Sequence, residues 1–80
     1  MTMTVKTWMY ENLCKDMSKY NYTPVAEKTI DGYSVEIGSI TIHTAKAIKV
    51  GVFCYKKAYG AEIDMNKHVW QCWIPKSALV

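Results

Sequence analysis

The cysteine and histidine side chains are the groups in this sequence best suited to chemistry. There are three thiols and two imidazoles, at Cys14, Cys54, Cys72, His43 and His68. Structural zinc sites use closely spaced pairs such as Cys-x2–4-Cys or His-x3–5-His, and neither pattern occurs here. His68 and Cys72 are four residues apart, a spacing that joins side chains on a helix but leaves them about 13 Å apart on a strand. We therefore expect no metal and no cofactor.

Nucleophilic catalysis would need one of the cysteines to meet a histidine in the folded chain, which almost any short protein with several cysteines would allow. No nucleophile elbow, phosphate-binding loop, dinucleotide fingerprint or paired-carboxylate motif accompanies them. We therefore expect a protein that is not an enzyme. The cysteines are odd in number and lack paired spacing, which predicts reduced thiols rather than disulfides.

The composition indicates a single folded domain over residues 1–80, with 50% hydrophobic and 21% charged residues. A chain of this size buries only about 60–65% of its unfolded surface, so one thin core is expected. Its longest apolar run, Val50–Tyr55, is far shorter than the roughly 20 residues of a membrane-spanning helix. The first residues lack the basic and apolar regions of a secretory signal. We expect a cytoplasmic protein without membrane association.

Apolar side chains at three- and four-residue spacing predict an N-terminal helix over about residues 5–20. Its apolar face would consist of Val5, Trp8, Met9, Leu13, Met17 and Tyr20. Such a face usually packs in a core, so we expect the helix to cover one side of a β-sheet. The alternative is a membrane-surface helix, but the polar side lacks the broad lysine-rich stripe of that class.

After the helix the apolar period becomes alternating, which predicts antiparallel strands over about residues 25–75. Asp31-Gly32 predicts a two-residue hairpin with Ile30 opposite Tyr33. Gly38-Ser39 predicts a second tight turn. The fold class is therefore α+β, with one helix packed on a curved antiparallel sheet of four to five strands.

Residues 48–54 should form the central strand of this sheet, with Lys49, Phe53 and Tyr55 on the side opposite its apolar residues. Residues 56–60 are read as a turn, and a final strand is expected over residues 69–74. Pro75 cannot donate to a strand ladder, so it should end that strand or lie at a sheet edge. A free edge there predicts pairing with a second copy, and hence a homodimer.

Positive charge is concentrated in the second half of the chain, which contains six lysines and two acidic residues. The first half contains four lysines and five acidic residues. The net charge is +3 and arginine is absent. Lysine lacks the planar two-pronged donor that reads base edges, so sequence-specific DNA recognition is disfavoured. Lysines mixed with aromatic rings do suit single-stranded nucleic acid, which is one functional hypothesis.

Two segments of the second half, Thr44-Ala45-Lys46-Ala47-Ile48-Lys49-Val50 and Trp73-Ile74-Pro75-Lys76-Ser77, carry a resemblance. They resemble a small β-rich module of proteins from bacteriophages and other mobile elements, in which a strand begins near a Lys-Ala pair and a Trp-Ile-Pro-Lys-Ser strand closes the unit. The match spans residues 44–80, and residues 56–67 are inserted relative to the compact form. The resemblance implies a small phage-type accessory protein in the bacterial host cytosol, and no enzymatic chemistry.

The first functional hypothesis is a protein-binding module that inhibits or adapts a host protein or nucleoprotein complex. Aromatic residues on an uncovered sheet face would anchor such an interface. Inhibitors of host defence, with anti-CRISPR proteins as the best-known class, are an analogy drawn from size and provenance. The alternative is a single-stranded nucleic-acid-binding accessory protein. The candidate binding residues are Trp73, Tyr55, Tyr59, Phe53, Lys49, Lys56, Lys57 and Lys76.

Overall fold

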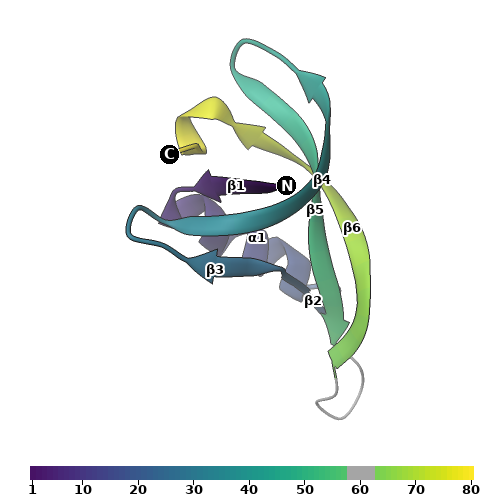
Figure 1. The fold of residues 1–80 in the computed structure, drawn as a ribbon. Coiled ribbons are helices and arrows are strands. Elements are labelled where there is room, and N and C mark those ends of the chain that lie inside the picture. The colour runs from purple at the N-terminus through teal and green to yellow at the C-terminus, as the bar shows by residue number, and fades with distance from the viewer. Residues whose placement is uncertain (58–62) are drawn as a thin grey trace.

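The computed structural model describes residues 1–57 and 63–80, which form one α-helix and a six-stranded antiparallel sheet that does not close (Figure 1). The predicted α+β architecture is confirmed, but the sheet has six strands rather than four to five. The elements in chain order are β1 (Thr2–Val5), α1 (Thr7–Ser18), β2 (Tyr22–Pro24), β3 (Ala26–Lys28), β4 (Tyr33–His43), β5 (Ala47–Lys57), β6 (Ile63–Pro75) and the short 3₁₀ helix η1 (Lys76–Ala78).

The helix is shorter than predicted, because the chain begins with a strand. Thr2 to Val5 alternate and include β-branched side chains, and they pair with β4 so that Val5 lies opposite Tyr33. Lys6 is extended and precedes the first helical residue. At the other end, Asn21 takes a positive φ of 63° and turns the chain into β2. Val5 is therefore a buried strand residue rather than part of the helical face.

The first hairpin has a longer loop than predicted. Lys28, not Ile30, lies opposite Tyr33. The loop is closed by the Thr29 N–H, which donates to the Gly32 carbonyl at 2.9 Å, and by the Gly32 N–H, which donates to Thr29 Oγ1 at 3.1 Å. The register differs from the prediction by two residues, and because side chains alternate with period two, Ala26, Glu27 and Lys28 keep their predicted faces, whereas Ile30 is an exposed loop residue.

The predicted second turn at Gly38-Ser39 is wrong, since both residues lie inside β4. The β4–β5 register shifts between Ile37 and Ile40, which marks a bulge that bends the long strand. Before the bend β4 pairs with β1 and β3, and after it β4 pairs with β5 (Figure 1). The turn itself follows β4, where the Thr44 N–H donates to the Ala47 carbonyl at 2.9 Å.

The core lies between α1 and the face of β5 that was predicted to be apolar. The side chains at Ile48, Val50, Val52 and Cys54 are buried, as are Met9, Leu13 and Met17 of the helix. The prediction of a central strand over residues 48–54 is confirmed, because β5 pairs with β4, β6 and β2. Each fully buried aliphatic side chain contributes about 1.5–3 kcal/mol.

The last strand is confirmed over residues 69–74 and extends further back to Ile63. It ends at Pro75, as predicted, and η1 follows. The chain then returns beside β1, where the Lys6 N–H donates to the Ala78 carbonyl at 2.7 Å and the Val80 N–H donates to the Thr4 carbonyl at 3.1 Å. Among the described residues, no helix is both long and apolar enough to cross a membrane.

Candidate functional site

The candidate site is the side of the sheet that faces away from α1, which we call the outer face. Alternate residues of β5 point to it, and their partners in β6 share it. Lys49 lies opposite Trp73, Phe53 opposite Val69 and Tyr55 opposite Lys67. The intervening residues of β5 belong to the core. The expectation that Lys49, Phe53 and Tyr55 share one side of the central strand is thus confirmed.

An exposed apolar patch crosses this outer face. We define it as Ile42, Val69 and Trp73, whose exposed fractions are 44%, 52% and 49%. Ile42 of β4 lies opposite Lys49 of β5, and Lys49 lies opposite Trp73 of β6. Ile42, Lys49 and Trp73 therefore form one row across three strands, and Val69 lies four residues before Trp73 on β6. The half-buried Lys49 stem therefore runs between two exposed apolar side chains. Residues in contact with solvent on a rigid sheet need little reordering to bind a partner.

Two glycines leave room for the larger side chains of the outer face. A Cβ at Gly38 would lie 3.3 Å from the Phe53 ring, and a Cβ at Gly51 would lie 2.6 Å from Val69 Cγ1. The Phe53 ring thus lies close over the β4 backbone, and Val69 lies over the β5 backbone. Phe53 and Val69 thus lie flat on the sheet, and the Trp73 side chain on the same face is 49% exposed to solvent.

One lysine of the outer face, Lys67, is paired with an acidic side chain. Lys67 Nζ donates to Glu36 Oε1 at 2.7 Å and lies 5.4 Å from the centroid of the Phe53 ring. The hydrogen bond to Glu36 raises the pKa of Lys67, so the ammonium is kept protonated. Lys67 was not among the predicted site residues. It lies in β6, which begins at Ile63 rather than at the predicted residue 69, so alternation continued back from Val69 would have placed Lys67 on the outer face.

The remaining predicted lysines do not gather on the outer face. Lys56 is exposed but lies with Tyr22 of β2, its Nζ 5.8 Å from the ring centroid. Lys76 lies in η1, beyond the end of β6. Lys57 belongs to β5, but its side chain and the whole of Tyr59 lie outside the described residues.

A second aromatic group lies on the helix side of the sheet. The half-buried Trp70 ring has its centroid 5.6 Å from Tyr20 and 5.9 Å from Tyr22. Tyr22 in turn contacts His68, with ring centroids 5.5 Å apart. Trp70 is therefore separated from Trp73, and the two indoles do not form one binding surface.

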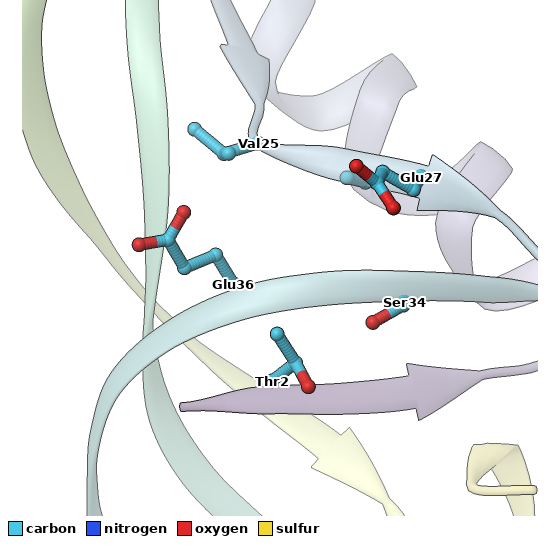
Figure 2. Close-up of a pocket in the computed structure, with 6 residues that line it drawn as sticks. Thr2, Val25, Glu27, Ser34 and Glu36 are labelled. Carbon is cyan, nitrogen blue, oxygen red and sulfur yellow. The ribbon is translucent and has the colours of Figure 1, made fainter.

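A shallow pocket of about 290 Å³ adjoins the outer face where β1, β3 and β4 pair (Figure 2). It is lined by Thr2, Val25, Ala26, Glu27, Ser34 and Glu36. Figure 2 shows its side chains on the side of the strands away from the helix. Glu36 links the two regions, because it lines the pocket and also binds Lys67 of β6.

The Cys54 and Cys72 thiols have the properties of structural groups. The register places Cys54 opposite His68, but the Cys54 thiol donates to the His68 carbonyl at 3.5 Å, and burial raises its pKa. Burial also raises the pKa of Cys72 to about 11. A hydrogen bond with Cys14 raises the pKa of Tyr10 to about 12. A thiol is a nucleophile only as the thiolate, which burial disfavours at Cys54 and Cys72.

Over residues 1–57 and 63–80, no group of three or more His, Cys, Asp or Glu side chains is arranged to hold a metal ion. Comparisons with protein-family models, curated proteins and solved structures found no match to this chain. Its function must therefore be argued from the surface itself.

Proposed function

We propose that this chain is a non-catalytic protein-binding module that acts on a host macromolecular complex as an inhibitor or adaptor. The observation that carries the proposal is Trp73 of β6, which is 49% exposed on the outer face and lies in one row across the strands with Lys49 and Ile42. Tryptophan on a pre-formed surface is the residue type most enriched among interface hot spots. The proposal therefore makes Trp73 the anchor of the interface.

The phage-type origin of the module rests on the resemblance of residues 44–80. A small protein of that provenance would act by occupying the working surface of a larger complex. Inhibition of a host defence nuclease, as anti-CRISPR proteins do, is the narrower form of the proposal and rests on analogy.

Single-stranded nucleic-acid binding is the second candidate. It is favoured by the position of Lys49 directly opposite Trp73, which places a cation beside an aromatic ring. Such surfaces combine several backbone-tracking cations with stacking rings. On the outer face, however, Lys67 is bound to Glu36, and Lys56 lies with Tyr22 away from this face. We therefore place protein binding first.

Salt dependence separates the two candidates. If lysine–phosphate contacts dominated, affinity for a labelled single-stranded oligonucleotide would fall steeply as salt rises. We expect no measurable binding at low salt. Tight binding at low salt that is lost at physiological salt would support the nucleic-acid alternative and contradict the protein-binding proposal.

Affinity capture from host extract tests the protein-binding proposal through matched tryptophan variants. Trp73→Ala removes the proposed anchor, whereas Trp8→Ala removes an indole of similar exposure, 46%, on the helix. We expect mass spectrometry to find one set of partners with the unchanged protein and with Trp8→Ala, and to find it depleted with Trp73→Ala. Equal recovery with both variants would contradict the assignment of Trp73.

A further inference from the structure

The strand β6 has a free edge along the described part of the sheet. It pairs with β5 on one side, and none of the strands in residues 1–57 and 63–80 pairs with its other side. In Figure 1 no further element lies to the right of the lower part of β6, whose upper part turns back toward the C-terminus. A long unpaired edge offers a ready template for another strand, and native proteins usually block it.

The hydrogen bonds of the neighbouring residues show which backbone groups this edge presents. The Lys76 N–H donates to the Lys46 carbonyl at 2.8 Å, so position 76 points toward the β5 side of the hairpin. In an antiparallel ladder, alternate residues point to opposite sides. The N–H and C=O groups that point away from β5 therefore belong to the odd positions: Lys67, Val69, Gln71 and Trp73. Pro75, which has no N–H, also falls on this outward side.

The usual protection of such an edge is weakened here. A lysine on an edge strand discourages pairing, because its charge would be desolvated or repelled. The Lys67 ammonium, however, is already bound to Glu36 of its own sheet. The other outward positions of the edge, Val69, Gln71 and Trp73, are uncharged.

We propose that β6 pairs antiparallel with β6 of a second copy of this chain, around a two-fold axis at Trp70. In this register Lys67 lies opposite Trp73 of the second copy, and Val69 lies opposite Gln71. Every outward backbone group from 67 to 73 then gains a partner, and Pro75 is left outside the pairing. The register also places each Lys67 opposite the uncharged Trp73 rather than opposite Lys67 of the second copy, so no like charges meet across the axis.

Aromatic side chains on both sides of the edge suit the same arrangement. Trp73 is exposed on the outer face, and on the helix side Trp70 has the exposed Tyr20 ring beside it. At the axis Trp70 meets Trp70 of the second copy, and cross-strand aromatic pairs are among the more favourable in sheets. The two outer faces would become continuous, so that the patches of both copies form one surface. This inference goes beyond the proposed function and does not depend on it.

The first test is the mass of the protein in solution, by analytical ultracentrifugation over a concentration series. We expect the unchanged chain to approach twice 9.2 kDa as its concentration rises. Gln71→Pro removes an outward N–H without removing a donor to β5, and we expect it to stay monomeric with an unchanged circular dichroism spectrum. An unchanged chain that is monomeric at the highest soluble concentration would overturn the proposal.

Disulfide trapping tests the register and does not depend on how Gln71→Pro folds. Directly opposite residues in a sheet have Cα atoms about 5.5 Å apart, which a disulfide spans, whereas diagonal neighbours are too distant. Under mild oxidation we expect a covalent dimer when Val69→Cys and Gln71→Cys chains are mixed, and none above the unchanged-protein background from either variant alone. Cross-linking by one variant alone would overturn the register, and no cross-linking in the mixture would overturn the pairing. Either failure leaves the partner capture through Trp73 unaffected.

Discussion

At the scale of single residues, two positions matter most: Trp73, the proposed binding residue, and Gly32, which restricts how the first hairpin packs on β1. Trp73 was recognised from residue type and strand alternation, and its exposure is confirmed at 49%. Residue type predicts Gly32 in a tight turn, but the structure shows that its Cα also packs closely against the Val5 backbone. A Cβ at Gly32 would collide with the carbonyl oxygen of Val5, a contact between β1 and the hairpin loop that no local pattern reveals.

We therefore expect Gly32→Ala to destabilise the fold by about 1–3 kcal/mol, because the added methyl group meets backbone that cannot rotate away and Gly32 has a positive φ of 158°. Urea unfolding followed by circular dichroism would measure the change. Gly38→Ala is the matched control, since its Cβ would meet only the Phe53 ring at 3.3 Å. Equal losses in the two variants would contradict this account of Gly32.

The Cys72 thiol predicts how stability depends on alkaline pH. Burial, with a smaller contribution from the Asp16 charge, raises its pKa from 9.0 to about 11. The folded chain holds this proton more tightly than the unfolded chain, so the contribution to stability is complete below pH 9 and is lost as the pH rises to about 11. Urea midpoints across this range should fall less steeply in Cys72→Ala than in the unchanged protein. Equal slopes would show that the thiol titrates alike in both states.

At the scale of elements, alternation and helical spacing predict the buried residues of β5 and α1, but they do not predict strand β1 or the bulge in β4. The buried positions of β5 and the helix residues Met9, Leu13 and Met17 follow the expected periods. Strand β1 was missed because Val5 also fits the helical spacing, and only pairing with β4 decides its conformation. Ile42 was missed as a patch residue because the bulge that carries β4 through Gly38-Ser39 depends on non-local pairing.

The helix offers a test of which apolar positions build the core. Leu13 is 2% exposed, and Leu13→Ala should cost about 2–5 kcal/mol of unfolding free energy. Trp8 fits the same sequence period but is 46% exposed, so Trp8→Ala should cost under about 1 kcal/mol. Denaturant midpoints of the two variants would measure the difference. A larger loss for Trp8→Ala would mean that the helix packs through a different face.

At the scale of the whole molecule, the helix and the C-terminal residues leave one side of the sheet uncovered. α1 covers the core side, while the last residues run beside β1 rather than across the outer face. The sequence could predict that one side of the sheet carries Lys49, Phe53 and Tyr55, but not which side the helix would cover. That choice follows from the burial of Ile48, Val50 and Val52 against the helix.

The uncovered outer face, with Trp73 as its anchor, is the central claim, and the affinity of a captured partner tests it most directly. Binding of that partner to the unchanged protein, to Trp8→Ala and to Trp73→Ala would be compared by calorimetry. We expect Trp8→Ala to bind as the unchanged protein does, and Trp73→Ala to bind at least about 30-fold more weakly, the equivalent of about 2 kcal/mol. Unchanged affinity in a folded Trp73→Ala protein would contradict the account.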